Sequence, residues 1–181
     1  MKTLRFIGMA IVAIIMSVNF VACSDDDDDI DVSQLEGTWG LVRSAGWEFC
    51  NEETEREEWD YTCDPYNPNS GDGECEKLVI KKLTDNTYSV AAYYYYGSKW
   101  QMDGSSQTLT LNGNTLTVSE TNGSYGYFDS YANLTIEALT ADKLAIRIKY
   151  DNVQTSQPTD PDYNPNHRDS ADFTETFTRM E

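Results

Sequence analysis

Oxygen-bearing side chains recur at alternate positions in one segment of the chain, at Asp160, Asp162, Asn164 and Asn166. Carboxylate and amide oxygens at this spacing can converge on one hard cation, as they do in calcium-binding loops. The match is incomplete, because Pro165 stands where a calcium loop turns on glycine and Ala171 stands where the bidentate glutamate would lie. A calcium site is therefore the weaker hypothesis for this segment. A melting temperature measured with calcium and with a chelator would test it.

Three of the four cysteines, Cys50, Cys63 and Cys75, lie in or beside one long segment without strand-like patterning. Three thiols can form one disulfide and leave one thiol over, and either Cys63 with Cys75 or Cys50 with Cys75 would close the segment. A zinc site is the rival hypothesis. His167 is the only histidine and no Cys-x-x-Cys pair is present, so the sequence favours the disulfide.

Catalytic constellations have little support in this chain. His167 has no second histidine, and no Gly-x-Ser-x-Gly sequence is present to activate a hydroxyl group. The acidic run from Glu52 to Glu58 is typical of a solvated surface rather than of a paired-carboxylate site. We therefore predict a protein that is not an enzyme and needs no cofactor, with a hydrolase as a minor alternative.

One acidic residue near the C-terminus, Glu175, falls at alternate positions with Phe173, Phe177 and Arg179. Side chains at alternate positions of a strand share one face, so Glu175 is expected to point inward with these residues. We expect a structural ion pair between Glu175 and either Arg43 or Arg179, because a buried carboxylate needs a partner.

Aromatic residues are the main candidates for ligand contact. They make up 12% of the sequence, and Tyr alone accounts for 12 residues. Tyr and Trp combine a large apolar surface with one polar group, and aromatic side chains commonly line ligand pockets. The candidate ligand-binding residues are Trp47, Trp59, Tyr93, Tyr95, Trp100 and Tyr125.

The elements that would position these residues are strands. Leu144, Ile146 and Ile148 alternate with Arg147 and Lys149, which gives one apolar and one polar face. Similar patterning, bounded by turn residues, marks nine segments: Gly37 to Phe49, Glu76 to Leu83, Thr87 to Tyr96, Lys99 to Met102, Gln107 to Leu111, Thr115 to Glu120, Phe128 to Leu139, Lys143 to Tyr150 and Phe173 to Arg179.

Short connections between these segments predict hairpins, and they include Asp103-Gly104-Ser105 and Asn112-Gly113-Asn114. Successive hairpins give an up-and-down meander, and eight to nine strands close into a barrel to remove their exposed edges. We therefore predict an all-β, antiparallel barrel. Two long loops, roughly 50–75 and 151–172, should meet at one end, because the first and last strands of a closed barrel are neighbours.

The N-terminus has the features of a secretory leader: Lys2 and Arg5 precede an apolar run that ends at Ala22 and Cys23. The run is too short and too early for a mature membrane span. An acidic run, Asp25 to Asp29, follows and is expected to be disordered because its charges repel one another. Removing the leader leaves 11 basic residues against 31 acidic ones, a net charge near −20. Such a polyanion is a poor nucleic-acid partner, and we expect a monomer.

Two motifs carry a resemblance to a known family: Gly37-x-Trp39 at the start of the first strand, and Phe177-Thr178-Arg179 at the end of the last. With the Ala22-Cys23 boundary and the acidic run, the chain resembles the lipocalin-like, surface-exposed lipoproteins of Bacteroidetes. The resemblance implies a Trp39 that plugs the closed barrel end, an Arg179 that packs across it, cleavage before Cys23 and acylation of Cys23. The Thr-Asp-Tyr pattern of true lipocalins is absent, so a transport function is not inherited.

The resemblance also implies boundaries and a location. Residues 1–22 would be a lipoprotein signal peptide, 23–33 an acylated cysteine with an acidic tether, and 34–181 the barrel domain. The protein would be lipid-anchored in the outer membrane and exposed on the cell surface. The alternatives are an ordinary secretory cleavage site with a chance cysteine, and an acidic linker that carries no address.

Three functions follow from these observations. The first is a barrel that binds a small apolar or glycan-like ligand. The second is an accessory module whose filled barrel docks a protein partner, and the third is the hydrolase. An open pocket would favour the first and a filled interior the second.

Overall fold

The computed structural model describes residues 30–69, 75–123, 125–155 and 164–180, so Cys23, the acidic run, Asp160 and Asp162 lie outside the described residues. A 3-10 helix, η2 (Val32–Gln34), precedes nine strands. Their bounds are β1 (Gly37–Cys50), β2 (Glu57–Thr62), β3 (Glu76–Lys82), β4 (Thr87–Tyr96), β5 (Lys99–Asn112), β6 (Thr115–Thr121), β7 (Asn133–Leu139), β8 (Lys143–Val153) and β9 (Asp169–Met180). None of the helices in this part of the chain could cross a membrane.

Alternation along the strands sets which residues form the core. In β8, Leu144, Ile146 and Ile148 are buried, whereas Lys149, which points to the opposite face, is exposed. The same period of two buries Tyr88, Val90 and Ala92 in β4, because successive side chains of a strand point to opposite faces. The predicted all-β core is therefore confirmed.

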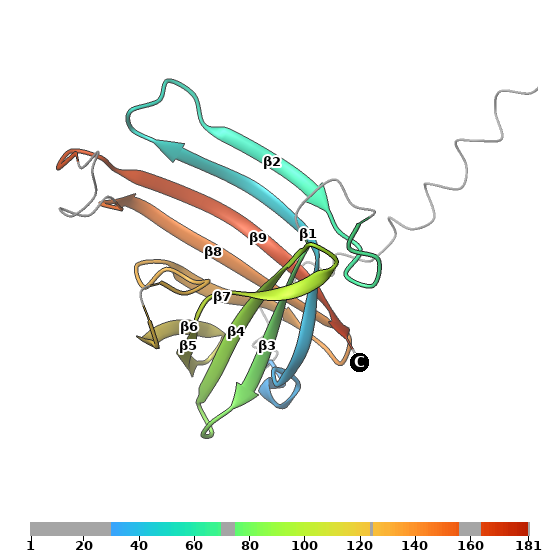
Figure 1. Ribbon diagram of the computed structural model, residues 1–181. Coiled ribbons are helices and arrows are strands. Elements are labelled where there is room, and N and C mark those ends of the chain that lie inside the picture. Colours follow the sequence, from blue (N-terminus) through green and yellow to red (C-terminus); the bar gives the residue numbers. More distant parts are fainter. Residues whose placement is uncertain (1–29, 70–74, 124, 156–163, 181) are drawn as a thin grey trace, which may run out of the picture.

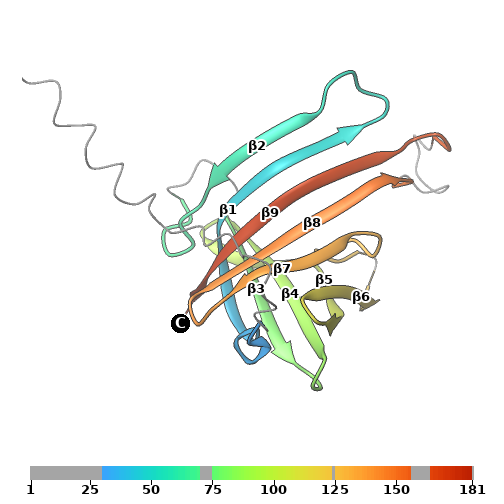
Figure 2. The same ribbon diagram turned by 180° about the vertical axis from the view of Figure 1, so that it is seen from behind.

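The strands form an up-and-down antiparallel barrel. Strands β3 to β9 pair in sequence order, and β1 closes the barrel by pairing with both β3 and β9. Figures 1 and 2 show β1 and β9 side by side along their whole length, from the C-terminus to the far tip of the sheet. The predicted closure of the first strand on the last is confirmed.

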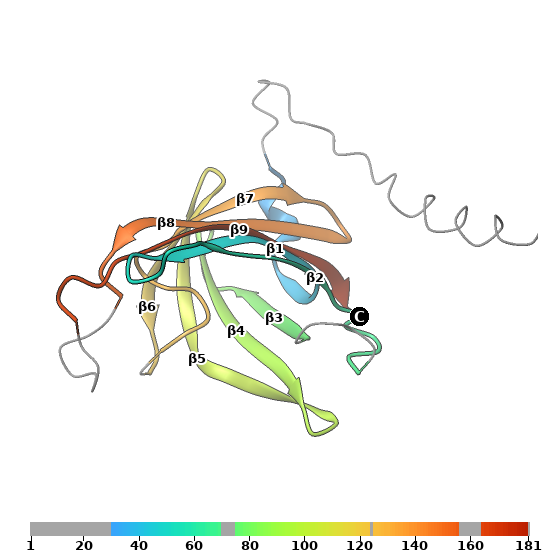
Figure 3. The same cartoon turned by 90° about the horizontal axis from the view of Figure 1, so that it is seen from above.

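One strand, β2, lies outside the closed barrel and, among the described strands, pairs only with β1, at the end where the barrel is open. Residues 37–40 of β1 pair with β3, whereas residues 43–48 of the same strand pair with β2. Strands β2, β1, β9 and β8 therefore extend as a sheet beyond the barrel, facing β3, β4 and β5 across the open end (Figures 1 and 3).

The opposite end of the barrel is closed by Trp39 and Arg179. Trp39 is fully buried, and its indole N–H donates to the Leu35 carbonyl at 2.9 Å. The Arg179 guanidinium lies over the indole at 4.2 Å and donates to the carbonyls of Gln34 and Glu36 beside η2. A Cβ on Gly37 would lie 2.2 Å from Arg179 Nη1, so this position has room only for glycine.

Three local expectations are wrong. Residues 103–105 do not form a turn: β5 runs through them, and Gly104, at φ +59°, lies at an irregularity where three residues face one residue of β4. Strand β2 lies inside the first expected loop. The sequence did not predict it, because Trp59 and Tyr61 alternate with polar residues over too short a span to be recognised as a strand. The strand expected from Phe128 begins only at Asn133.

The two long loops meet at the tip of the β1–β9 ribbon. The Asn51 side chain donates to the Asn166 carbonyl at 2.8 Å and accepts from the Arg168 N–H at 2.9 Å. The Asp64 segment of the first loop lies at the closed end instead, where the Tyr66 hydroxyl donates to the Arg179 carbonyl. Only the first part of that loop therefore belongs to the open end.

Candidate ligand pocket at the open end of the barrel

A pocket of about 240 Å³ lies between the extended sheet and the β6–β7 connection. Ligand pockets are typically about 300–1,000 Å³, so this one suits a small molecule. Its lining residues come from five strands and one loop and are Glu48, Trp59, Tyr61, Glu76, Tyr127, Phe128, Asp129, Ile148, Tyr150, Phe173 and Glu175. A neighbouring pocket of about 300 Å³ shares Glu76 and continues toward β4 and β5.

One aromatic wall of the pocket is built on β2 and β9. The Trp59 indole N–H donates to Ser44 Oγ at 3.0 Å, and Ser44 is a buried residue of β1. The Trp59 ring also packs against Phe173, with ring centroids 5.3 Å apart. The hydrogen bond and the ring contact together fix the indole at the pocket wall.

The opposite wall belongs to the β6–β7 connection and depends on one buried amide. Gln107 of β5 accepts from the Phe128 N–H at 2.8 Å and donates to the Phe128 carbonyl at 2.6 Å. Because both backbone groups of Phe128 bond to one side chain, the loop is held against the sheet. Tyr127 and Phe128 pack edge to face at 4.9 Å in this position.

Three polar side chains form a hydrogen-bonded chain at the base of the pocket. The Tyr127 hydroxyl lies 2.6 Å from Glu76 Oε2 and 3.0 Å from Glu175 Oε1. A phenol has one proton to donate. It therefore donates to one carboxylate, and the other must carry a proton of its own if it is to bond to the same oxygen. Glu175 is only 7% exposed, and its second oxygen, Oε2, is buried without a hydrogen-bond partner.

The protonation of this chain follows from burial and from like charge. Burial and the Glu76 carboxylate raise the pKa of Glu175 to about 8, although the Tyr127 hydroxyl opposes the shift. Burial and the two carboxylates raise the pKa of Tyr127 well above its ordinary value. Glu175 and the Tyr127 phenol therefore both keep their protons at neutral pH in the empty pocket.

The pocket has a negative electrostatic environment. Burial, followed by the neighbouring charges of Glu57, Asp169 and Glu53, raises the pKa of Glu48 at the rim. None of the described residues that line the pocket is a lysine, an arginine or a histidine.

The structure separates the candidate ligand-binding residues. Trp59 lines the main pocket and Tyr125 lines its neighbour. Tyr93, Tyr95 and Trp100 lie elsewhere, because their parity in the strands places them on the opposite face from the buried side chains of β4.

On that outer face, the Lys77 ammonium lies over Tyr93 and Trp100, and Tyr95 packs edge to face on Trp100. The Arg56 guanidinium lies over Trp47 at 5.3 Å.

Of the described residues expected to ligate calcium, Asn164 Oδ1 accepts from the Asn166 backbone N–H at 2.9 Å.

The ion pair expected for Glu175 is absent. Glu175 points inward as predicted, but β1 has an irregularity between Leu41 and Arg43 that pairs Ser44, and not Arg43, with Glu175. Arg43 faces outward and binds Asp60 with two hydrogen bonds of 2.8 Å. Arg179 is engaged at the closed end. The hydrogen-bond partner of Glu175 is the Tyr127 hydroxyl and not an arginine.

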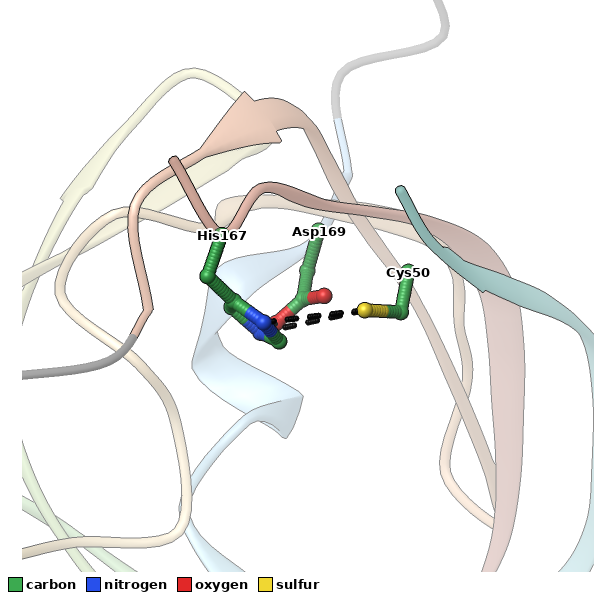
Figure 4. Close-up of side chains that lie close together, drawn as sticks. All are labelled: Cys50, His167 and Asp169. Atoms are coloured by element: carbon green, nitrogen blue, oxygen red, sulfur yellow. Dashed lines mark hydrogen bonds and ion pairs between the residues drawn. The ribbon is translucent and has the colours of Figure 1, made fainter. Parts of the chain in front are cut away.

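The cysteines fall into two groups. Cys63 and Cys75 form a disulfide, with Cα atoms 5.6 Å apart, which joins the end of β2 to the start of β3. Cys50 is free and lies 3.6 Å from His167 Nδ1, while His167 Nε2 lies 2.9 Å from Asp169 Oδ2 (Figure 4).

A cysteine, a histidine and an aspartate in this order could form a nucleophilic triad. The Glu52 backbone N–H lowers the pKa of the Cys50 thiol, but burial and the Asp169 and Glu52 carboxylates reverse this, and the net shift is upward. The thiolate is the nucleophile, so these surroundings disfavour catalysis by Cys50.

Comparisons with known proteins were made at the level of sequence and of fold. No family model matches the chain, and no curated protein matches it. Siderocalin Ex-FABP, described as functioning through dual ligand specificities, is similar in fold, with 10% identity and a TM-score of 0.45 over 81% of this chain and 74% of that chain. A second siderocalin, described as revealing a dual ligand binding mode, has 12% identity and a TM-score of 0.45 over 83% and 73%.

EF1p2_mFAP2b, solved bound to DFHBI, has 12% identity to this chain and a TM-score of 0.40, over 82% of this chain and 96% of its own.

Proposed function

We propose that this protein is a binding protein whose open barrel end takes a small organic cation, an amine attached to an aromatic or aliphatic group. One observation carries the proposal: Glu175 Oε2 is buried in a pocket of about 240 Å³ without a hydrogen-bond donor. A buried oxygen of this kind costs free energy until a donor reaches it. An ammonium N–H is such a donor.

The charge of the lining favours an amine over other donors. Glu48, Glu76, Asp129 and Glu175 all face the pocket. A ligand ammonium would gain from these carboxylates, and from the faces of Trp59 and Tyr61, which attract cations. A carboxylate or phosphate ligand would be repelled.

The sequence suggests a small apolar or glycan-like ligand, and this proposal replaces that broad class with organic amines. A purely apolar molecule would bury carboxylates and leave Glu175 Oε2 without a donor, which is unfavourable. A glycan could supply hydroxyl donors, but it would not neutralise the charge. The aromatic wall of Trp59 and Phe173 accommodates the apolar part of an amine.

The pocket also bears on the accessory-module and hydrolase alternatives. A barrel filled by its own side chains would support docking of a protein partner, whereas an open pocket lined by aromatic rings supports ligand binding. The raised pKa of the Cys50 thiol is a further reason to favour a binding protein over an enzyme.

The location of the protein is proposed from its leader. The basic N-terminus, the apolar run and Cys23 support an exported lipoprotein, anchored through Cys23 and held off the membrane by the acidic run. The barrel would then act as a monomer at the outer membrane surface, where small amines in the surroundings would reach the open end.

Isothermal titration of the protein with phenethylamine tests the proposed ligand class. Phenethyl alcohol, which lacks the positive charge, and phenylpropionate, which carries a negative charge, are the matched probes. We expect phenethylamine to bind at least tenfold more tightly than either. Equal binding of the alcohol, or tighter binding of a neutral oligosaccharide, would contradict the proposal.

Glu175→Gln separates binding in this pocket from general attraction of cations to an acidic protein. It should weaken phenethylamine at least tenfold above pH 8, where the wild-type carboxyl is ionised. Glu120→Gln is the control, because Glu120 is an exposed residue of β6 and its loss changes the net charge equally. A similar effect of both substitutions would indicate non-specific attraction.

A further inference from the structure

A second cluster of chemistry-bearing side chains lies at the tip of the β1–β9 ribbon, outside the ligand pocket lining. Cys50 ends β1, Asp169 begins β9, and the two residues are partners in the antiparallel register. His167 lies two residues before Asp169. Figure 4 shows the His167 imidazole beside the Asp169 carboxylate, with both close to the Cys50 thiol.

The donor atoms lie close to the separations that one tetrahedral metal ion requires. His167 Nε2 is 4.0 Å from Cys50 Sγ and 2.9 Å from Asp169 Oδ2. Zinc binds sulfur at about 2.3 Å and nitrogen or oxygen at about 2.0–2.2 Å, so tetrahedral neighbours lie roughly 3.3–3.6 Å apart. The sulfur, a ring nitrogen and an Asp169 oxygen all lie within 4.8 Å of one another.

The imidazole and the Asp169 carboxylate are each held by a further contact. Glu52 Oε2 lies 3.4 Å from His167 Nδ1, and the Thr155 hydroxyl donates to Asp169 Oδ2. A carboxylate that accepts the second ring N–H of a histidine is the usual outer partner of a metal-binding imidazole. Glu52 is therefore placed to orient His167 with Nε2 toward Asp169.

The two loops that carry these side chains are joined by further hydrogen bonds. The Asn164 amide donates to Glu52 Oε1, which leaves Oε2 directed at the imidazole. Asn51 bonds to the backbone of both Asn166 and Arg168. The nearby Arg168 guanidinium donates to the His167 and Pro165 carbonyls and to Gln154. The donor set is thus assembled by the folded chain.

We infer that Cys50, His167 and Asp169 bind a divalent transition-metal ion of the zinc type. Cys50 supplies Sγ, His167 supplies Nε2, Asp169 supplies a carboxylate oxygen, and a water molecule completes the four positions. Binding releases the thiol proton to solvent and involves no change of oxidation state. The site is independent of the amine proposed for the barrel pocket.

Cobalt(II) is the probe for this site, since thiolate coordination gives a near-ultraviolet charge-transfer band and a tetrahedral site gives intense visible bands. We expect both on titrating the full chain, expressed without lipidation, and their loss on adding zinc. Cys50→Ser should abolish the charge-transfer band, whereas Cys23→Ser should leave it unchanged. Absence of the band in the wild type, or its persistence in Cys50→Ser, would overturn the inference.

Glu52→Gln tests the orienting role of the Glu52 carboxylate. Loss of an outer carboxylate partner typically weakens metal binding roughly 10–100-fold, so cobalt should bind more weakly with the charge-transfer band retained at saturation. Glu120→Gln, an exposed residue of β6, is the charge-matched control and should leave the affinity within about twofold.

Alkylation of the wild-type protein supplies a test that needs no variant. Zinc should slow the reaction of iodoacetamide with Cys50 at least tenfold and leave the reaction of Cys23 unchanged, as measured by mass spectrometry. Equal rates at Cys50 with and without zinc would contradict metal binding. Rapid alkylation at neutral pH, unaffected by zinc, would favour a reactive thiol instead.

Discussion

At the scale of single residues, the pocket is defined by Glu175. Its position two residues before Phe177 placed it on the inner face from sequence alone, because alternate side chains of a strand share a face. Its partner could not be predicted. Tyr127 comes from a connection far along the chain, and the irregularity in β1 that turns Arg43 outward leaves no trace in a pattern of period two.

The raised pKa of Glu175 makes a prediction about stability. This carboxyl is protonated below pH 4.5 in both the unfolded and the folded chain, but between pH 4.5 and about 8 only the folded chain retains the proton. Folding then takes up a proton, so stability falls as pH rises through this window, by up to about 1.4 kcal/mol per pH unit.

Glu175→Gln removes this titration. We expect the variant to be close to the wild type in stability at pH 4.5 and more stable by several kcal/mol at pH 8, because the amide is neutral throughout. Urea denaturation at both pH values measures the difference. A stability difference that does not change with pH would show that Glu175 has an ordinary pKa in the folded protein.

At the scale of elements, the regular strands were predictable and the pocket walls were not. In strand β8, Leu144, Ile146 and Ile148 recur at alternate positions and are buried, although Ala145 between them is buried as well. Strand β2 shows only Trp59 and Tyr61 on its inner face, beside a run of acidic residues. The β6–β7 connection has no periodicity, since its position depends on Gln107, 21 residues before Phe128.

The Gln107 contact predicts the behaviour of that connection. Gln107→Leu would leave the buried N–H and carbonyl of Phe128 without partners, at a cost of roughly 2–4 kcal/mol. Amide hydrogen exchange at Phe128 should accelerate more than exchange in β8. Unchanged exchange at Phe128 would mean that the loop is held by other contacts.

The disulfide predicts a local effect on β2. Cys63 and Cys75 close a loop of 12 residues, and removing such a link typically costs about 3 kcal/mol. The paired substitution Cys63→Ala and Cys75→Ala should therefore lower stability by about this amount and accelerate exchange at β2 amides. Strands β5 and β6 should exchange at rates that follow the global loss alone. Selective protection of β2 in the variant would contradict this assignment.

At the scale of the whole molecule, the closed barrel followed from the sequence because hairpin connections and alternation repeat along the chain. The sequence did not predict that β1 pairs with β3 in its first part and with β2 in its last part, although this change of partner opens the pocket. The cluster of Cys50 and His167, which are 117 positions apart, could be found only once the first and last strands were placed together. The formal net charge of −18 agrees with a preference for cations at both sites.

The most direct test of the account is the affinity of the wild-type protein for phenethylamine as a function of pH. Because the ammonium binds the ionised form of Glu175, whose pKa is about 8 in the empty pocket, affinity should rise by up to about tenfold per pH unit from about pH 6 to pH 8 and then level off. Calorimetry should also detect proton release below pH 8. An affinity that is flat or falling over this range would contradict the account.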